Sequence, residues 1–156
     1  MSKPVFVLNG PNLNLLGTRE PAVYGAETLA DVRRRTETRA KALGLEVDFR
    51  QTNSEGTLVD WIQEARDRAG GIVINAGAYT HTSIAMLDAL NAAAMPVVEL
   101  HLSNVFRRER FRHKSYVTPA AEGLICGFGP KGYELAIDAM ADLLARTESR
   151  GQAAQG

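Results

Sequence analysis

Glu99 and His101 are the residues whose types and spacing suggest chemistry most directly, because they stand two positions apart in the apolar run from Met95 to Ser103. In a β-strand, residues two apart point to the same side, about 7 Å from each other along the backbone. A carboxylate beside an imidazole can move protons, and open α/β sheets bind ligands at the carboxyl ends of their strands. A structural pair covered by the following helix accounts for the same two residues. The pattern therefore predicts a strand end that carries either a catalytic pair or a structural one.

The segment from Asn9 to Gly17 follows the first apolar run and contains three asparagines, two glycines and one proline. We expect it to shape a pocket with neutral hydrogen-bonding groups. Neither the G-x-G-x-x-G pattern nor the G-x-x-x-x-G-K-[ST] pattern of phosphate-binding loops occurs here. Asparagines also favour turns by bonding their own backbone, which explains one or two of the three. The loop thus predicts a polar pocket rather than a nucleotide site.

Arg19 and Tyr24 lie in the next segment, Thr18 to Gly25, for which the sequence predicts an irregular, mobile lid. The pKa of a tyrosine phenol is normally near 10, but a nearby arginine favours the phenolate and lowers that pKa. Tyr24 beside Arg19 is thus a candidate general base. A packing or solvent-facing loop tyrosine is the alternative that the residue types leave open.

Another polar segment, Asn75 to Ser83, follows an apolar run and leads into a predicted helix. The amino end of a helix favours anions, so a carboxylate or a hydroxyl-rich ligand would fit there. Asp88 follows His81 at a spacing that can bring it near the same end of the helix, although a solvent-facing carboxylate fits equally well. With three histidines, no cysteine partners and no H-x-x-x-H spacing, we expect no metal site.

Short apolar runs alternate with helical periodicity along the chain, which predicts an α/β fold with a parallel sheet and helices on both faces. The five expected strands are Val5 to Leu8, Leu45 to Gln51, Gly71 to Asn75, Val97 to His101 and Leu124 to Cys126. Four helices are expected, with apolar stripes that begin at Leu29, Leu58, Ile84 and Tyr133. Trp61 belongs to the second stripe, so we assign it to the core or a subunit contact.

At 156 residues, the chain has the usual size of one domain. We expect a single catalytic domain over residues 1–147 and a disordered tail over residues 148–156, which lack apolar content. Five basic residues occur between Asn104 and Tyr116. For that stretch we expect an exposed functional segment rather than a packed helix.

Charge and composition limit the partners. Eighteen basic residues balance eighteen acidic ones, so we expect neither nucleic acid nor a membrane surface as a partner. No apolar stretch has the length of a membrane span, and no basic-then-apolar signal follows Lys3, so we expect a cytoplasmic protein. Cys126 is the single cysteine, and we expect a buried, inert thiol. The expected partner is a small molecule.

Four segments read together resemble the type II 3-dehydroquinate dehydratases, also called dehydroquinases. The resemblance rests on Gly-Pro-Asn-Leu-Asn-Leu-Leu-Gly, Arg19 with Tyr24, Asn-Ala-Gly-Ala-Tyr-Thr-His-Thr-Ser, Glu-Leu-His-Leu-Ser-Asn and Phe-Arg-His-Lys-Ser-Tyr, in that order. It implies a flavodoxin-like sheet and a homododecamer arranged as a tetramer of trimers. It also implies the reversible dehydration of 3-dehydroquinate to 3-dehydroshikimate, a step of the shikimate pathway, with no cofactor.

The resemblance implies a role for each catalytic candidate. Tyr24 would remove a proton from the carbon next to the ketone, with Arg19 lowering the pKa of its phenol. His101 would protonate the departing hydroxyl, with Glu99 orienting its ring. Asn12 would hold a water that stabilises the enolate, where negative charge develops. The anti elimination would therefore run through an enolate.

The substrate contacts carry over in the same way. Asn75, His81 and Arg112 would bind ring hydroxyls. The backbone amides of Leu102 and Ser103, with the Ser103 hydroxyl, would hold the carboxylate. Both assignments are implied by the resemblance alone.

Asp88 would reach in from a neighbouring subunit, which makes the oligomer part of the active site.

The sequence also departs from the family pattern. Leu102 stands where isoleucine is common, which leaves the backbone amide unchanged. Phe106 and Arg107 stand where a histidine and a small residue are frequent, which can alter the nearby loop or subunit contacts.

Two other functions stay open. A flavodoxin-like module that binds a polyhydroxy acid or a nucleotide without catalysis would use the same loops, although it has little need for an acid and a base. A dehydratase of a related β-hydroxy ketone would share every candidate residue. The unrelated type I enzyme uses a lysine imine, which is disfavoured because no lysine lies in an apolar strand: the lysines are Lys3, Lys41, Lys114 and Lys131.

Overall fold

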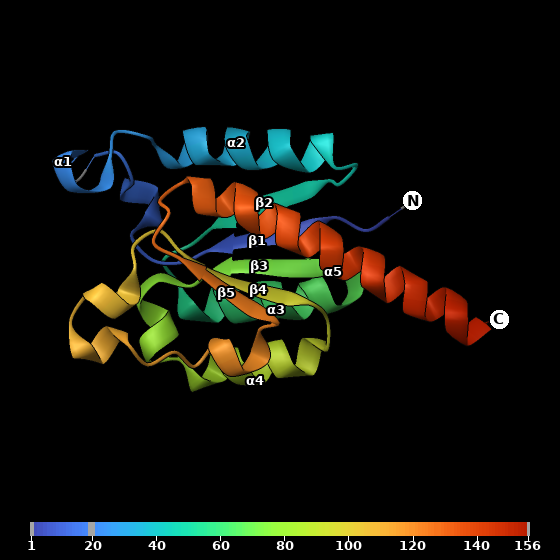
Figure 1. The fold of residues 1–156 in the computed structure, drawn as a ribbon. Helices are drawn as coiled ribbons and strands as arrows, with labels where there is room; N and C mark the ends of the chain where they lie inside the picture. The colour runs from blue at the N-terminus through green and yellow to red at the C-terminus, as the bar shows by residue number, and fades with distance from the viewer. Residues whose placement is uncertain (1, 19–20, 156) are drawn as a thin grey trace.

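A five-stranded parallel sheet forms the centre of the molecule in the computed structural model (Figure 1). The structure describes residues 2–18 and 21–155, without the side chains of residues 23, 24 and 153–155. The strands are β1 (Val5–Asn9), β2 (Val47–Gln51), β3 (Gly71–Asn75), β4 (Val97–His101) and β5 (Gly123–Cys126), in the spatial order β2-β1-β3-β4-β5. Every neighbouring pair is parallel. The predicted α/β, flavodoxin-like fold class is confirmed.

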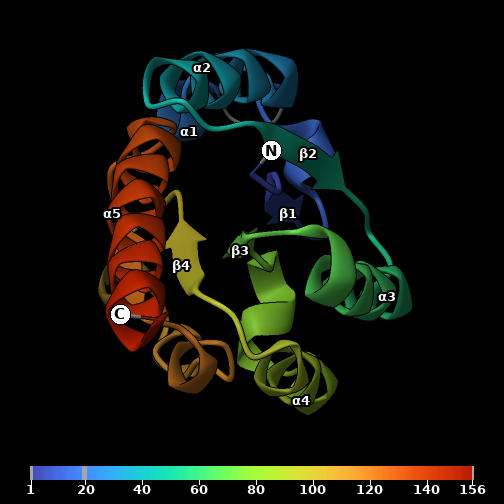
Figure 2. The ribbon, with the colours of Figure 1, turned by 90° about the vertical axis from the view of Figure 1, so that its right-hand side faces the viewer.

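Helices cover both faces of this sheet. They are α1 (Pro21–Tyr24), α2 (Leu29–Ala42), α3 (Glu55–Arg68), α4 (Ile84–Ala93) and α5 (Lys131–Gln155). Helices α2 and α5 lie on one face and α3 and α4 on the other, as the end-on view in Figure 2 shows. Five short 3-10 turns lie within the connections: η1 (Leu13–Leu15), η2 (Gly77–His81), η3 (Val105–Arg107), η4 (Arg110–Arg112) and η5 (Thr118–Ala120).

Local sequence signals explain where three of the helices begin. Thr28 and Asp31 form a capping box at α2, in which each side chain accepts a hydrogen bond from the other residue's backbone N–H. The Ser54 hydroxyl accepts from Thr57 N at the start of α3, and the Ser83 hydroxyl accepts from Met86 N at the start of α4. These caps satisfy backbone N–H groups that the first turn of a helix leaves without a partner.

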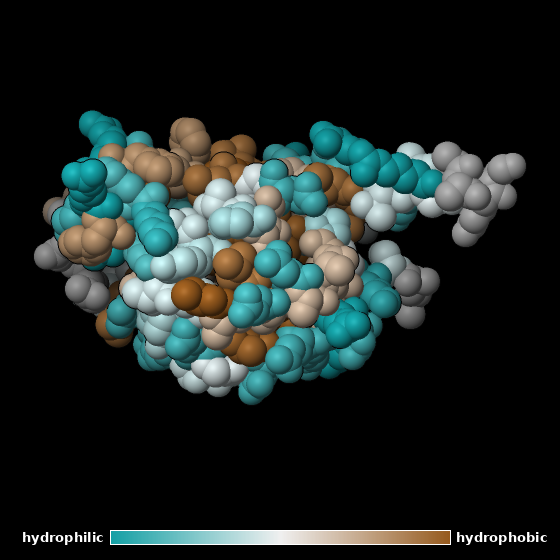
Figure 3. Space-filling view, turned by 90° about the horizontal axis from the view of Figure 1, so that it is seen from below, coloured by the Kyte–Doolittle hydropathy of each residue, from teal (hydrophilic) through white to brown (hydrophobic). Residues whose placement is uncertain are grey.

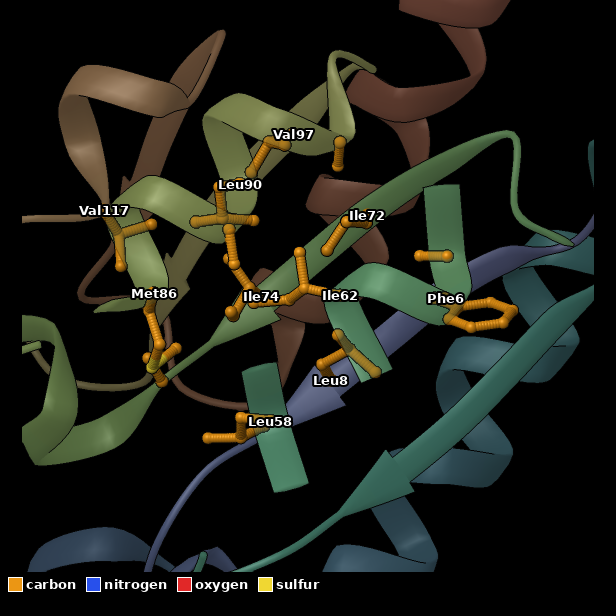
Figure 4. Close-up of a cluster of buried hydrophobic side chains, with 14 of the residues drawn as sticks. Phe6, Leu8, Leu58, Ile62, Ile72, Ile74, Met86, Leu90, Val97 and Val117 are labelled. Atoms are coloured by element: carbon orange, nitrogen blue, oxygen red, sulfur yellow. The ribbon is translucent and has the colours of Figure 1, made fainter. Parts of the chain in front are cut away.

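The two core layers follow from strand alternation. Phe6 and Leu8 of β1 pack toward α3 and α4, whereas Val5 and Val7 pack toward α2 and α5. All four side chains are at most 1% exposed. Figure 4 shows the first layer, where β1 and β3 side chains meet those of the two helices. Burial on both faces explains why the strands read as continuous apolar runs.

The strand order determines where a ligand would bind. From β1 the chain crosses to β2 on one side and then to β3 on the other, so the connections diverge between β1 and β3. In this topology, ligands bind outside the carboxyl ends of the strands near that divergence. The same edge carries η1, η2, η3 and η4, which lie away from the N-terminus in Figure 1.

Two segments differ from the sequence expectation. Helix α1 forms a single turn inside the segment expected to be irregular. Helix α5 continues to Gln155, through the segment expected to be disordered, and its last turns project beyond the sheet (Figure 1). Alanine, glutamate and arginine favour helix without needing an apolar face, so helical residues continue after the apolar stripe ends. Disorder of this tail and the domain limit at residue 147 remain predictions.

The surface combines polar residues with separate apolar side chains. Figure 3 views the molecule from the side of α4, where apolar residues are visible between hydrophilic ones. Of the side chains that the structure describes, four large apolar ones are more than half exposed, namely Ile84, Phe106, Phe111 and Phe128. Among the described residues, no helix combines the length and the apolar character needed to cross a membrane.

Candidate active site

A cavity of about 380 Å³ opens at the carboxyl edge of the sheet. That volume lies within the usual range for small-molecule sites. Its walls come from the loop after β1, from the ends of β3 and β4, and from η2 and η4. The candidate residues that line it are Asn12, Asn75, His81, His101, Leu102, Ser103 and Arg112. Seven residues singled out from the sequence are thus brought together around one space.

Glu99 and His101 lie together at the end of β4, on the same side of the strand as predicted. His101 Nε2 lies 2.6 Å from Glu99 Oε2. The Glu99 carboxylate also accepts hydrogen bonds from the hydroxyls of Ser115, at 2.9 Å, and of Thr118. Glu99 is 1% exposed and His101 5% exposed, so both groups are withdrawn from water.

The environment of Glu99 keeps it ionised. Burial raises the pKa of Glu99, but hydrogen bonds from His101, Thr118 and Ser115 lower it by more, so the pKa lies below its ordinary value. A carboxylate at neutral pH therefore faces one nitrogen of the His101 ring. This contact fixes the ring and leaves the other ring nitrogen for proton transfer with a ligand.

His81 and Asn75 form the wall beside this pair. The rings of His81 and His101 are nearly parallel, with centroids 6.4 Å apart and an interplanar angle of 17°. His81 Nδ1 lies 2.8 Å from the Lys114 carbonyl, which positions its ring. Asn75 ends β3 and is 3% exposed. Its Nδ2 donates to the Tyr133 hydroxyl at 3.0 Å, so the amide orientation is fixed from behind the cavity.

The loop after β1 is positioned by its backbone. Asn12 adopts a left-handed conformation with φ of 70°, which asparagine tolerates better than most residues. Its backbone N–H donates to Asn53 Oδ1 at 3.0 Å. Gly10 lets this loop contact the loop after β3, because a Cβ at Gly10 would overlap the Ala76 carbonyl. The Gly10 N–H also donates to the Asn75 carbonyl at 2.8 Å, which joins the two walls.

The third wall of the cavity, formed by the segment that follows β4, is polar and basic. The Leu102 carbonyl accepts a hydrogen bond from Gly129 N at 2.9 Å, which fixes the peptide that leads to Ser103. Arg112 Nε donates to Glu109 Oε2 at 2.8 Å. Arg108, which we did not assign a role, also lines the cavity. Its position next to Arg112 gives this wall positive charge that suits an anionic ligand.

A second cavity of about 500 Å³ lies across the same loop and shares Leu102, Ser103 and Arg108 with the first. Arg107, one of the three residues that depart from the family pattern, contributes to it. In the described part of the chain, no histidine and no carboxylate lines this space. The smaller cavity therefore collects the groups that can do chemistry.

Four candidates do not line this cavity in the structure. Glu99 lines a neighbouring cavity of about 270 Å³ together with His101. Arg19 lies outside the described residues, and Tyr24 is described only as the last residue of α1, without its side chain. Asp88 is exposed on α4, and it does not line the cavity of its own chain. Within the described part of the chain, no group of three or more histidine, cysteine, aspartate or glutamate residues is arranged to hold a metal ion.

Sequence reasoning missed the residues that hold the candidates in place. Ser115 occurs in one of the quoted motifs but was given no role, and Thr118 was not considered. Tyr133 was assigned to an apolar stripe, and it is fully buried, yet its hydroxyl also bonds Asn75. No sequence signal identifies these partners, because each contact joins segments that meet only in the folded sheet.

The fold and the cavity define a class of protein: a flavodoxin-like α/β protein with a small-molecule site at its strand ends, containing a buried carboxylate–imidazole pair and neutral amides. Known proteins are similar to this chain over most of its length. A 3-dehydroquinate dehydratase of Phenylobacterium zucineum is 62% identical over 143 residues, which cover 92% of this chain and 99% of that protein. One of Rhizobium johnstonii is 57% identical over 145 residues, covering 93% and 100%.

A solved structure agrees with these sequences. The type II dehydroquinase of Propionibacterium acnes superposes with a TM-score of 0.86 at 46% identity, covering 91% of this chain and 98% of that one. The family model described as "Dehydroquinase class II" matches residues 3–141. The chain belongs to the class II dehydroquinase family.

Proposed function

We propose that this protein is a 3-dehydroquinate dehydratase, a hydro-lyase that reversibly converts 3-dehydroquinate to 3-dehydroshikimate in the shikimate pathway. The observation that carries the proposal is the buried Glu99–His101 pair, of which His101 lines a cavity that also contains amide, hydroxyl and arginine side chains. An acid held in this way suits the protonation of a departing hydroxyl. A module that only binds a ligand has no use for such a pair.

The proposed reaction is an anti elimination that balances without a cofactor. The Tyr24 phenolate, favoured by Arg19, takes a proton from the carbon next to the ketone, and an enolate forms. A water held by Asn12 stabilises the enolate oxygen. The enolate then re-forms the ketone as the carbon–carbon double bond forms and the carbon–oxygen bond breaks. His101 gives its proton to the departing hydroxyl, which leaves as water.

The proposed substrate contacts fit the chemistry of the walls. Asn75, His81 and Arg112 supply donors and acceptors for ring hydroxyls. The backbone amides of Leu102 and Ser103, with the Ser103 hydroxyl, hold the carboxylate. The positive charge of the third wall supports this placement of the anionic group.

We further propose a homododecamer, arranged as a tetramer of trimers, in which Asp88 enters the site of a neighbouring subunit. Asp88 is exposed on α4. Ile84, the first residue of the same helix, is 55% exposed, and Phe106 in η3 and Phe111 in η4 are 54% and 66% exposed. We propose that neighbouring subunits cover these side chains, because burial at an interface would remove their apolar surface from water. We also propose a cytoplasmic location, because the sequence has no apolar stretch of membrane length.

The activity is tested by mixing the purified protein with 3-dehydroquinate and following the ultraviolet absorbance of the conjugated enone. We expect turnover that resists a chelator and prior borohydride treatment, because no metal and no lysine imine takes part. An active protein that loses turnover with chelator would contradict the mechanism. Absence of turnover, with turnover of a related β-hydroxy ketone or binding alone, would contradict the proposed function.

The shared site is tested by mixing two inactive variants, His101→Ala and Asp88→Ala, after joint unfolding and refolding. If Asp88 serves a neighbouring subunit, mixed oligomers contain some sites with both residues intact and regain part of the activity. Light scattering gives the subunit number in the same samples. Mixed oligomers without recovered activity would show that Asp88 does not act across subunits.

A further inference from the structure

Tyr133 carries the only hydroxyl that joins the ends of β1 and β3 among the described residues. It comes from α5, is 0% exposed, and packs its ring against Phe49 with centroids 6.1 Å apart. Its hydroxyl donates to Asn9 Oδ1 at 2.6 Å and accepts from Asn75 Nδ2 at 3.0 Å. Asn9 and Asn75 are paired residues at the last positions of the two strands. The hydroxyl therefore lies directly behind the cavity wall.

The hydrogen bonds of this group have a fixed direction. Asn9 Nδ2 donates to the Arg50 carbonyl at 3.0 Å, so the Oδ1 of Asn9 must accept. The Tyr133 hydroxyl has a single hydrogen, which it donates to Asn9 Oδ1. Toward Asn75 the hydroxyl oxygen can therefore only accept a hydrogen bond. Gly77 N–H donates to Asn75 Oδ1 at 3.3 Å, which agrees with the same orientation. The backbone carbonyl of Arg50 thus determines, through two side chains, which way the Asn75 amide points.

The orientation of this amide matters at the cavity. With one Nδ2 hydrogen bonded to Tyr133, Asn75 keeps one further hydrogen and an Oδ1 lone pair for a ligand. A rotated amide would exchange its donor and its acceptor. A ring hydroxyl would then meet the wrong group, and a buried polar atom would lose its partner.

We propose that Tyr133 is a positioning residue, which fixes the amide of Asn75 in the orientation that binds a substrate hydroxyl. The inference rests on the proposed function, because it assumes that Asn75 binds the substrate. Tyr133 does not itself take part in proton transfer, since burial raises the pKa of its phenol and keeps it neutral. Its hydroxyl acts through Asn75 alone.

The test compares Tyr133→Phe, Asn75→Ala and the double variant. Tyr133→Phe keeps the ring and removes the hydroxyl, and we expect it to lower kcat/KM by about 3- to 30-fold, the range of an orienting hydrogen bond. In the Asn75→Ala background, the same substitution should change kcat/KM by less than about twofold, because the amide that it orients is absent. Equal effects in both backgrounds would overturn the proposal.

Ile137→Val is the matched control. Ile137 is also fully buried on α5 and packs in the same core layer, but it belongs to none of these hydrogen bonds. If Tyr133 only supported core packing, the effects of Tyr133→Phe and Ile137→Val on kcat/KM would both be independent of Asn75. We expect the Ile137→Val effect, which reports core packing, to be the same with and without Asn75.

A second measurement does not depend on the reaction. In a neutron diffraction structure of Tyr133→Phe, which distinguishes the amide nitrogen from the oxygen, we expect the Asn75 amide to rotate or to occupy two orientations, with Ile137→Val leaving it unchanged. An Asn75 amide that stays in place without the hydroxyl would overturn the positioning role. If the wild-type protein failed to dehydrate 3-dehydroquinate while the amide moved as expected, only the proposed function would be wrong.

Discussion

The ends of β3 and β4 and the loop after β1 line the same cavity, yet they hold their polar groups in different ways. Asn75 and Glu99 are nearly inaccessible, and hydroxyls from other segments fix their side chains. Asn12 is exposed, and what is fixed there is its backbone, through a left-handed conformation and a bond to Asn53. One wall is thus organised by side-chain hydrogen bonds and the other by backbone geometry. Substitutions in the two regions should therefore reduce turnover or stability for different physical reasons.

The largest effect is expected at the strand end. Replacing His101 by Ala removes the proposed acid, and turnover should fall by about 10²- to 10⁴-fold, which is the usual contribution of a general acid. The enone absorbance assay gives the rate, and thermal unfolding checks that the variant is folded. His113→Ala is the control, because His113 is exposed and its Nε2 contacts the Arg108 carbonyl, at 3.0 Å, rather than Glu99. Equal losses in both variants would contradict the assignment.

Glu99→Gln tests whether the strand end depends on charge. Hydrogen bonds hold the pKa of Glu99 below its ordinary value, so folding favours the ionised form. The resulting stability is fully present above the unfolded pKa, near 4.3, and is lost as the pH falls through the lower folded pKa. The variant should lose about 1 to 3 kcal/mol of unfolding free energy at pH 7.

Below about pH 4.3, the difference between the wild type and Glu99→Gln should shrink, because both then carry a neutral side chain at this position. Urea unfolding at a fixed protein concentration, at several pH values from 7 downward, measures this difference. A difference that stayed constant down to the lowest pH would mean that ionisation of Glu99 contributes nothing.

Gly10→Ala tests the backbone contact between the two walls. The added Cβ would overlap the Ala76 carbonyl, so the loops must separate, at a cost of about 1 to 3 kcal/mol for overpacking. Gly56→Ala in α3 is the control, since its nearest neighbour would be the Ser54 hydroxyl at 3.9 Å. That change should stabilise the protein slightly, by up to about 1 kcal/mol. Chemical unfolding of both variants decides whether Gly10 is needed for close approach.

The smallest change in stability is expected at Asn12. Asn12→Gly keeps the left-handed conformation without strain, whereas Asn12→Ala costs about 1 kcal/mol. Both remove the side-chain amide, so both should lose similar turnover. Measuring stability and turnover of the pair separates the backbone requirement from the proposed chemistry. If Asn12→Gly kept full turnover, the side chain would have no catalytic part.

The same contrast explains how far the sequence could predict the molecule. Strand positions were predicted to within two residues, because alternation and apolar runs are local signals. The alternation of side chains along a strand also predicted that Glu99 and His101 lie on the same side of β4. The cavity walls could be grouped because parallel strands bring their carboxyl ends to one edge.

The partners of the site residues could not be predicted in this way. Tyr133 bonds Asn9 across 124 positions of sequence, and Ser115 reaches Glu99 across 16. Such contacts depend on how helices and loops pack on the finished sheet, which no local pattern describes. The single turn of α1 was also missed, since four residues are too few to give a periodic signal.

The hydroxyl of Tyr133 has a consequence for synthesis on the ribosome. The chain is made from its amino terminus, and α5 emerges after all five described strands. The strands that carry Asn9, Asn75 and His101 are all complete before Tyr133 appears. A nascent chain can therefore pair β1 with β3 early, but its buried asparagines lack their shared partner until the final helix docks. Premature termination before α5 should leave polar groups exposed in a half-built sheet, a marker by which quality control could recognise the unfinished protein.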